Sequence, residues 1–379
     1  MSARPASLAA RLLACAWLSA AGVLGAGEPR TSEGFPVPEA GHVFRFPRDH
    51  GSHPDFKIEW WYVTGHAYAA GGRRFGFEAT FFRSAAPRDG AGAAGSADFG
   101  AGQVYLAHMA LLDVRTGRFL HEERLNREGW DAGSAVERLA VHNGPWSLEM
   151  APAPGEGMTL SGGIRSEAAF SFHLEPRKPL VEFGDHGYSR KGAAASAASY
   201  YLTFPRLELS GTLRYGAETL DVKGEAWMDH EVSSSQLDPG QVGWDWACLQ
   251  LGDGTEMMCY RMRRADGTVD PFSTLSLVDR QGRVESVGPA GFRWEVLDTW
   301  KSPATGAVYP VRVRLTVGAR AGKPARVLLL EPLARDQELA GGAGGIPYWE
   351  GACRVTDGSG ADLGSAFLEL TGYAGRLRL

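Results

Sequence analysis

The sequence predicts an all-β protein with little helix, folded as two successive β-barrels or β-sandwiches. β-branched and aromatic residues recur in short alternating runs, which are typical of half-buried strands. The 379 residues include 50 glycines and 11 tryptophans, a composition that favours a β protein with many turns. Apolar residues show little helical periodicity beyond the N-terminal signal. A chain of this length accommodates two domains, and we expect them at residues 27–238 and 239–379, with the boundary near the turn signal Leu237–Gly240.

The charge of the chain is near balance. Its formal net charge is −5, with 22% charged residues, so the sequence lacks the basic surface that nucleic acid requires. We therefore expect no nucleic-acid partner.

Residues 1–26 are typical of an export signal. Arg4 and Arg11 precede an apolar run, Leu12–Ala26, that is too short and too rich in alanine and glycine for a membrane anchor. We expect cleavage near Ala26 and a periplasmic or secreted mature protein. No later stretch approaches membrane-spanning length, so the mature chain is predicted to contain no transmembrane segment.

Four prolines keep residues 31–56 extended and loop-like. The spacing of His50 and His53 is compatible with metal binding, but no nearby cysteine or second histidine pair accompanies them. We predict a hydrogen-bonded loop here and no metal site.

The first predicted hairpin turns at Gly71-Gly72, a register that pairs Tyr62 with Phe81 on an aromatic face. The other face carries Trp61 and Glu78. A carboxyl group among aromatic side chains costs several kcal/mol unless it is paired or protonated. Glu78 is therefore expected either in a structural hydrogen-bond network or at a cavity.

The next strand is predicted at Val104–Val114, where His108 is either a hydrogen-bonded core histidine or part of a pocket. Residues 87–102 before it are rich in glycine and alanine and are expected to form a flexible loop. The polar segment Arg118–Glu128 is expected to hold a short helix or irregular structure. Six further strands are expected before the central stretch, at Glu137–His142, Trp146–Met150, Met158–Gly162, Ala168–Glu175, Tyr200–Arg206 and Glu208–Tyr215.

The most informative stretch is Gly224–Met262, which combines tryptophans, carboxylates, a histidine and a serine run. Side chains at i and i+2 share one face of a strand. Trp227, Asp229 and Glu231 are therefore predicted to project together, with His230 on the opposite face. We expect a site here.

A second hairpin within this stretch is predicted to turn at Asp253-Gly254 and to pair Cys248 with Cys259. Such a pair either forms a disulfide or remains as buried thiols, and we favour the thiols. On this register, Trp244, Trp246 and Gln250 share the face of Cys248, while Asp245 and Tyr260 lie on the other face. Seven strands are expected after the hairpin, at Ser273–Val278, Val284–Val287, Phe292–Val296, Val311–Val317, Arg326–Leu330, Tyr348–Thr356 and Ala366–Gly372.

Several sequence blocks carry a resemblance to a known family. They are EWWYVTGH (Glu59–His66), GFEATFFR (Gly76–Arg83), AHMALLD (Ala107–Asp113), AWMDHEVSSS (Ala226–Ser235), GWDWACLQLGDG (Gly243–Gly254), YWEGACRV (Tyr348–Val355) and LELTGY (Leu368–Tyr373). With these blocks the chain resembles the carotenoid 1,2-hydratase-like family, also known as the hydroxyneurosporene synthase or AttH family. The resemblance implies two tandem lipocalin-like β-barrels. For the hydratase branch it also implies addition of water, without a cofactor, to a terminal C=C bond of an acyclic carotenoid.

Alkene hydration needs a strong general acid, a surface that stabilises a carbocation, and a water molecule. A carboxyl group kept protonated in an apolar pocket supplies the acid, and tryptophan faces stabilise the cation. We predict Asp229 or Asp245 as the proton donor, with Glu231 close to Asp229 and with His230 positioning water or the acid. The predicted ligand-binding residues are Trp61, Tyr62, Glu78, His108, Trp227, Trp244, Trp246, Gln250 and Tyr260.

Other interpretations stay open. The segment WMDHE is equally compatible with a buried polar network that joins two barrels. Since lipocalin-like cavities bind apolar ligands, a second function is a non-catalytic periplasmic carrier of a lipid or hydrophobic metabolite. Because some exported members of the family accompany transporters of the lipoprotein-release type, the partner of such a carrier would be an ABC transporter permease of that type. A secreted hydrolase ranks third, because no serine nucleophile motif supports it. Whether the chain is an enzyme is undecided by its sequence; as an enzyme it would be a cofactor-independent hydro-lyase.

Overall fold

The computed structural model of the chain describes residues 29–86, 102–152, 154–320, 322–342 and 345–377. The expected export signal at residues 1–26 and most of the loop expected at 87–102 lie outside these residues. Within the described ranges, none of the helices has the length and apolar character needed to cross a membrane.

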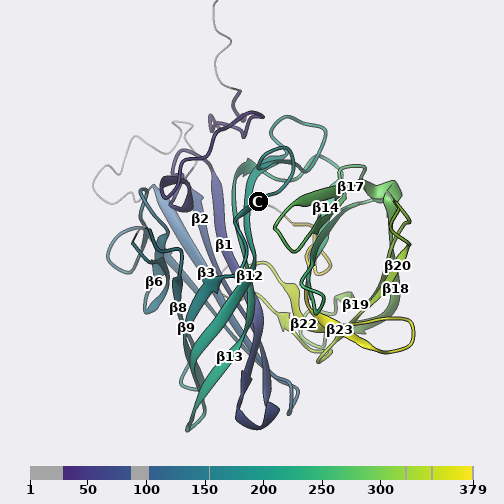
Figure 1. The fold of residues 1–379 in the computed structure, drawn as a ribbon. Coiled ribbons are helices and arrows are strands. Elements are labelled where there is room, and N and C mark those ends of the chain that lie inside the picture. The colour runs from purple at the N-terminus through teal and green to yellow at the C-terminus, as the bar shows by residue number, and fades with distance from the viewer. Residues whose placement is uncertain (1–28, 87–101, 153, 321, 343–344, 378–379) are drawn as a thin grey trace, which may run out of the picture.

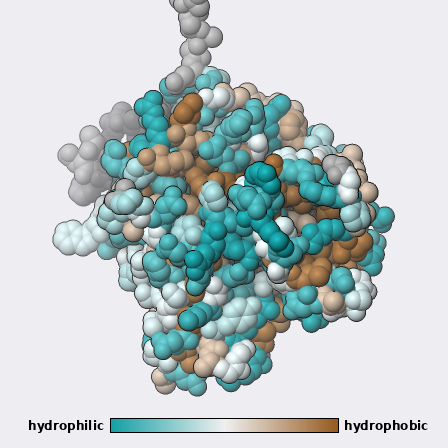
Figure 2. All heavy atoms as spheres, viewed as in Figure 1, coloured by the Kyte–Doolittle hydropathy of each residue, from teal (hydrophilic) through white to brown (hydrophobic). Residues whose placement is uncertain are grey.

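The fold is all-β, as the sequence predicts, and consists of two curled antiparallel sheets that stand side by side in the tandem lipocalin-like arrangement (Figure 1). The helices in the described residues are three short 3-10 turns, η1 (Arg48–His50), η2 (Ala70–Gly72) and η3 (Pro289–Gly291). The outer surface in the view of Figure 2 is mostly hydrophilic, and its apolar atoms lie in patches.

The first sheet has thirteen strands in the order β4-β3-β2-β1-β13-β12-β9-β8-β7-β6-β5, with β10 and β11 paired to β12. Their bounds are β1 (Ile58–Ala69), β2 (Arg74–Ala85), β3 (Gln103–Asp113), β4 (Arg118–Arg127), β5 (Ala132–Ser134), β6 (Ala140–Asn143), β7 (Trp146–Met150), β8 (Met158–Ile164), β9 (Ala168–Pro176), β10 (Val181–Glu182), β11 (Tyr188–Arg190), β12 (Ala198–Tyr215) and β13 (Glu218–Ser235). The sheet curls until its two edges meet: the side-chain amide of Asn143 in β6 donates hydrogen bonds of 3.1 Å to the carbonyls of Tyr105 in β3 and Arg124 in β4.

The second sheet has ten strands in the order β17-β16-β15-β14-β23-β22-β20-β19-β18, with β21 paired to β22. Their bounds are β14 (Gln241–Leu251), β15 (Glu256–Arg264), β16 (Thr274–Val278), β17 (Val284–Val287), β18 (Phe292–Lys301), β19 (Val308–Val317), β20 (Arg326–Pro332), β21 (Glu338–Leu339), β22 (Tyr348–Thr356) and β23 (Asp362–Leu370). The chain passes from the first sheet to the second between Ser235 and Gln241.

Each sheet encloses an apolar core, and a third buried layer lies between the two sheets. Alternation along each strand divides its side chains between these layers. In β1, Trp61 and Val63 enter the first core, whereas Tyr62 joins the layer between the sheets. Gly76 of β2 has the same outward direction, and a Cβ there would lie 2.4 Å from the Cβ of Ala352 in β22, so glycine permits the close approach of the sheets.

Buried ion pairs fasten the two sheets together at one end of this layer. Lys178, which follows β9, bonds the Glu256 carboxylate and the carbonyls of Gly254 and Asp279, at 2.8 and 2.7 Å. Arg206 of β12 donates to the other oxygen of Glu256 at 2.6 Å. Glu256 is buried, so its charge depends on both cations for compensation.

The register predicted for each hairpin is wrong by one residue. Tyr62 pairs with Thr80 and Trp246 pairs with Tyr260. The first turn takes three residues, the η2 turn Ala70–Gly72, where the sequence suggested two. A slip of one residue exchanges the faces of a strand relative to its partner, so Glu78 shares the face of Tyr62 and not that of Trp61.

The same slip separates the cysteines that the sequence placed opposite each other. Cys248 pairs with Met258 and faces the layer between the sheets, whereas Cys259 pairs with Ala247 and faces the second core. Both are free and buried, as is Cys353, so the favoured interpretation as buried thiols is confirmed and the disulfide is excluded. The prediction of a helix or irregular segment at Arg118–Glu128 is also wrong, because Arg118–Arg127 form edge strand β4.

We predict that Lys178→Met lowers the free energy of unfolding by about 2 kcal/mol or more, because it leaves part of the buried Glu256 charge uncompensated. Urea denaturation measures this change. Arg283→Met is the control: it removes an exposed ion pair with Asp279 and is expected to leave the free energy of unfolding nearly unchanged. Equal effects of the two substitutions would contradict a fastening role for Lys178.

Candidate functional site

Two adjoining cavities lie between the sheets. The inner one has a volume of about 50 Å³ and is lined by Trp60, Tyr62, Thr80, Phe82, Asp229, Trp244, Trp246, Tyr348 and Glu369. The outer one has a volume of about 330 Å³ and is largely apolar, with Ile58, Val104, Leu106, Leu125, Ile346 and Leu377 in its walls. The two share Trp60, Phe82, Trp244, Tyr348 and Glu369 as lining residues. An apolar approach therefore leads to a small aromatic pocket that contains two carboxyl groups.

Asp229 of β13 is held on one wall of the inner pocket by hydrogen bonds to both of its oxygens. Thr203 and the indole of Trp227 donate to Oδ1 at 2.5 and 2.8 Å, and Tyr201 donates to Oδ2 at 2.8 Å. The indole of Trp246 in turn donates to the Tyr201 hydroxyl at 3.0 Å. Burial raises the pKa of Asp229 to about 7, although these donors act in the opposite direction.

Glu369 of β23 reaches the same pocket from the second sheet. Its Oε2 accepts one hydrogen bond of 3.0 Å, from the indole of Trp244. Burial raises the pKa of Glu369 to about 7 as well. Near neutral pH, each of the two carboxyl groups is therefore present in both protonation states.

A second pair of buried carboxyl groups, Glu78 and Glu350, belongs to the same layer. Thr80 donates to one oxygen of Glu78, and Tyr62 donates to Oε1 of Glu350 at 2.5 Å. The remaining oxygen of each group is buried and has no hydrogen-bond partner among the described residues. Burial raises the pKa of each carboxyl group well above its usual range, which favours the neutral form.

His108 and Tyr348 link the outer cavity to the inner pocket. His108 lines the outer cavity, and its Nδ1 lies 2.9 Å from the Tyr348 hydroxyl. Burial lowers the pKa of His108 to about 4, so its imidazole is neutral. His108 is thus part of a pocket wall, one of the two interpretations that the sequence left open.

Glu231 shares the face of Asp229, as predicted, but is occupied by other partners. Lys191 lies 3.1 Å from its carboxylate, and Ser199 donates to the same oxygen at 2.5 Å. The Lys191 ammonium also lies 4.2 Å from the centre of the Tyr260 ring. Glu231 therefore influences Asp229 through its negative charge and does not line the pocket.

The structure places several predicted site residues away from this pocket. Asp245 points into the second barrel, where it pairs with Arg261 at 2.8 Å and Arg263 at 2.9 Å. His230 lies on the first-barrel side of β13, opposite to Asp229, so it cannot position that acid or its water. Trp61 lies in the first core, stacked on His230 at 4.9 Å. Strand alternation thus directs all three side chains away from the inner pocket.

Three more predicted residues face the layer between the sheets without lining the inner pocket. Gln250 donates to the carbonyls of Pro205 and Ala226 at 2.9 and 2.8 Å and so joins β14 to the first sheet. Tyr260 lines a separate cavity, and Trp227 lies behind Asp229. Of the predicted set, Tyr62, Asp229, Trp244 and Trp246 meet in the inner pocket.

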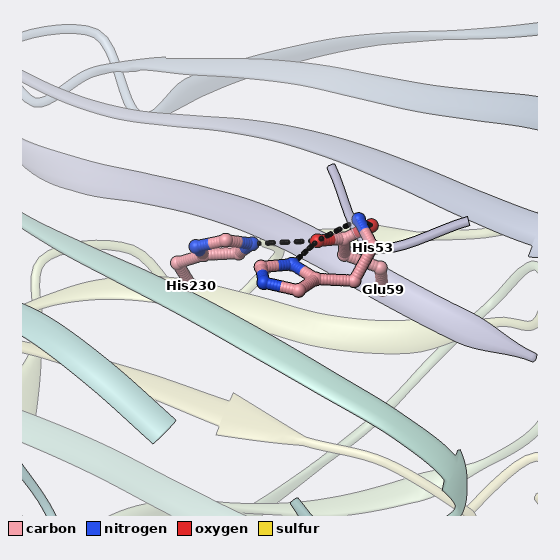
Figure 3. A group of neighbouring side chains, drawn as sticks. All are labelled: His53, Glu59 and His230. Carbon is pink, nitrogen blue, oxygen red and sulfur yellow. Dashed lines mark hydrogen bonds and ion pairs between the residues drawn. The ribbon is translucent and has the colours of Figure 1, made fainter. Parts of the chain in front are cut away.

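His230 belongs to a separate polar cluster with His53 and Glu59 (Figure 3). Oε1 of Glu59 lies 2.9 Å from Nδ1 of His53 and 2.8 Å from Nε2 of His230, and the three potential ligand atoms lie within 4.8 Å of one another. Two imidazoles and one carboxylate form a common donor set for transition metals. His50 is not part of this set; the centre of its ring lies 4.4 Å from that of Phe46.

Hydrogen bonds from protein groups occupy both oxygens of the Glu59 carboxylate in this cluster. Its Oε2 accepts from Arg83 at 2.8 Å, from Ser52 at 3.0 Å and from the backbone amide of His53 at 2.9 Å. Burial by itself would raise the pKa of Glu59, but the two histidines and the Arg83 guanidinium hold it well below its usual range. Asp49 accepts from the far nitrogen of His53 at 3.2 Å, and its bond together with that to Glu59 raises the pKa of His53 against the effect of burial. We therefore assign the cluster to fastening the loop around His53 onto the first barrel.

Comparisons with known proteins place this arrangement in a family. A family model described as AttH-like matches residues 37–373. This chain belongs to the AttH-like family. A crystal structure of a protein described as an AttH from Nitrosomonas europaea is 34% identical, covers 89% of this chain and 99% of its own, and superposes with a TM-score of 0.78. A comparison with curated protein sequences gives no match.

Two more distant crystal structures share the fold of this AttH-like chain. Kievitone hydratase from Nectria haematococca is 13% identical, with a TM-score of 0.65 and coverage of 92% of this chain and 97% of its own. CghA is 12% identical, with a TM-score of 0.55 and coverage of 90% and 96%. At these identities the likeness shows the tandem fold alone.

Sequence reasoning missed several pocket residues of the AttH-like chain, namely Trp60, Thr80, Phe82, Tyr348 and Glu369. A signal for Glu369 was present: it stands between Leu368 and Leu370, which enter the second core, so alternation turns its carboxyl toward the layer between the sheets. The register error placed Phe82, which shares the face of Glu78, on the face of the hairpin away from Tyr62.

We predict that Glu59→Gln lowers the free energy of unfolding by about 3–5 kcal/mol, because it removes the charge that compensates Arg83 in a buried site. Urea denaturation measures the loss, and Glu218→Gln, at a more exposed ion pair with Arg73, is the control. Added zinc or EDTA is expected to leave the melting temperature of the wild type unchanged, because a ligand stabilises only the state that it binds. A rise with zinc that Glu59→Gln abolishes would instead identify a metal site.

The pKa values of about 7 for Asp229 and Glu369 predict a specific dependence of stability on pH. Their ordinary values are 3.8 and 4.5, so between about pH 4 and 7 the folded state retains protons that the unfolded state has released. Their contribution to stability is therefore greatest at low pH and falls as pH rises through this window.

Glu369→Gln is expected to remove its share of that slope and to stabilise the protein at pH 8 by on the order of 1–3 kcal/mol relative to the wild type. Unfolding free energies from pH 4 to 9 give the difference curve, with Glu218→Gln as the surface control. A difference curve that is flat between pH 4 and 8 would refute the raised pKa.

Proposed function

We propose that this AttH-like protein is an exported, cofactor-independent hydratase that adds water to a C=C bond of an apolar ligand bound between its two barrels. The observation that carries the proposal is Asp229: a carboxyl group with a pKa of about 7 in an aromatic pocket that adjoins an apolar cavity. A carboxyl group of this kind retains a proton near neutral pH and can deliver it to carbon.

The chemistry of the first step follows from the walls of the pocket. Proton transfer from Asp229 to the less substituted carbon of the alkene breaks the π bond and leaves a tertiary carbocation next to the Asp229 carboxylate. The faces of Trp60, Trp244 and Trp246 and the negative charge on Asp229 both favour a cation there. Water then adds to the cation and loses a proton, which yields a tertiary alcohol.

The size and polarity of the cavities indicate the class of ligand. The inner pocket of about 50 Å³ accepts a water molecule beside a small alkyl group, and the outer cavity of about 330 Å³ accepts an apolar chain. An isoprenoid end, with its branched terminal alkene, has this shape, and an acyclic carotenoid is one member of the class. Kievitone hydratase shares the tandem fold, and its name supports hydration as a reaction that this fold performs.

A non-catalytic carrier is the second candidate, and the outer cavity favours it because its apolar walls suit a lipid without any reaction. In that case the partner would be an ABC transporter permease of the lipoprotein-release type, which receives the ligand after export.

The test compares Asp229→Asn with Asp245→Asn, because the sequence offered both residues as the acid. Geranylgeraniol and lycopene in detergent serve as probes, and mass spectrometry follows incorporation of ¹⁸O from labelled water. We expect Asp229→Asn to lower the rate by about 10²–10⁴-fold with binding retained. Asp245→Asn, on the far face of β14, should retain the wild-type rate per folded molecule.

Two results would contradict this proposal. An equal loss of rate per folded molecule in both variants would refute Asp229 as the proton donor. Tight binding of either probe by the wild type without any ¹⁸O product would favour the carrier.

A further inference from the structure

We propose that Glu369 is a second catalytic carboxyl group of the inner pocket, which accepts the proton of the attacking water while Asp229 supplies the proton to carbon. The inference rests on the proposed hydration and deepens it, because it gives the second proton transfer a residue on the opposite sheet.

The geometry that carries this inference is the position of the two groups in one small pocket. Asp229 comes from β13 of the first sheet and Glu369 from β23 of the second, and both line the cavity of about 50 Å³. A ligand end within this volume has a carboxyl group on each side. Addition of water to a C=C bond, whether syn or anti, needs a proton donor and a proton acceptor, and this pocket contains a carboxyl group for each role.

The hydrogen bonds of the two groups differ in a way that separates their roles. Both oxygens of Asp229 are engaged by three donors, which fix its direction and stabilise the carboxylate that remains after proton transfer. Glu369 receives a single donor, the Trp244 indole, at Oε2. Its Oε1 accepts no hydrogen bond from the residues that the structure describes, and this oxygen is the one that is open to a water molecule.

The steps balance without an oxidant, a reductant or a cofactor. The O–H bond of Asp229 breaks and a C–H bond forms, with the electron pair of the alkene. The water oxygen then forms a C–O bond to the cation, and its O–H electron pair stays with oxygen as the proton moves to Glu369. Return of that proton to Asp229 through pocket water resets the pair.

Electrostatics supports the same assignment. A developing positive charge lies between indole and phenyl faces, with a carboxylate on either wall. The pocket should therefore favour a tertiary ammonium with an apolar tail, which mimics the carbocation, over a neutral compound of the same shape.

The first experiment measures this preference. N,N-dimethyloctylamine is the cationic probe and 2-methyldecane its neutral isostere, with binding followed by tryptophan fluorescence at pH 7.5. We expect the wild type to bind the amine about 10-fold more tightly than the isostere, and Glu369→Gln to lose most of that ratio. Glu338→Gln is the matched control, a buried carboxyl group bonded to Tyr309 in the second barrel, and should retain the ratio. A wild-type ratio near one, or an unchanged ratio in Glu369→Gln, would overturn the proposal.

The second experiment follows turnover of the isoprenoid probe against pH. A donor that must be protonated and an acceptor that must be ionised give a bell-shaped profile whose two apparent pKa values belong to the pair. Glu369→Gln should lower the rate by about 10²-fold and remove the acidic limb, whereas Glu338→Gln should keep the whole profile.

The outcomes separate the two proposals. A wild type that hydrates the probe, with Glu369→Gln equally active and bell-shaped, refutes the role of Glu369 and leaves hydration standing. A wild type that hydrates neither probe refutes the hydratase and the role of Glu369 with it.

Discussion

Burial of carboxyl groups in the layer between two sheets is the constraint on which the site depends. Water would ionise these groups, and it is the loss of water that raises the pKa of Asp229 and Glu369 to about 7. Indole and phenol rings from both sheets line much of this layer and shield the carboxyl groups from bulk water, with the ring centres of Trp227 and Trp246 6.2 Å apart. The ion pairs of Glu256 with Lys178 and Arg206 then hold the sheets at the distance that this packing needs.

The same constraint distinguishes the acids of the layer from the other buried acids of the chain. Glu59 and Asp245 are buried as completely, yet each has arginine within 3 Å and serves as a charged anchor inside its own barrel. Asp229 and Glu369 have neutral donors in place of arginine. Burial without a neighbouring cation is therefore what raises the pKa of the carboxyl groups in this layer.

Much of the fold and part of the site could be predicted from the sequence. The rest could not, for physical reasons. Alternation within a single strand needs only local geometry, so the opposite faces of Asp229 and His230 were predicted correctly. Pairing between strands depends on the conformation of the turn, and one extra residue at Ala70–Gly72 reversed the assignment of Glu78. The approach of Glu369 to Asp229 depends on the docking of two separately curled sheets, about which neither strand carries local information.

The site lies on the outside of both barrels. As a result, the residues of one strand that pack the barrel core differ from those that line the site. In β1, the odd-numbered side chains Trp61 and Val63 fill the first barrel, while the even-numbered Trp60 and Tyr62 face the ligand cavities. Substitutions at the odd-numbered positions can therefore change stability, and substitutions at the even-numbered positions can change which ligand fits, with little effect of one on the other. A lipocalin-like barrel that holds its ligand inside has no such freedom, because there the core and the binding surface are made of the same residues.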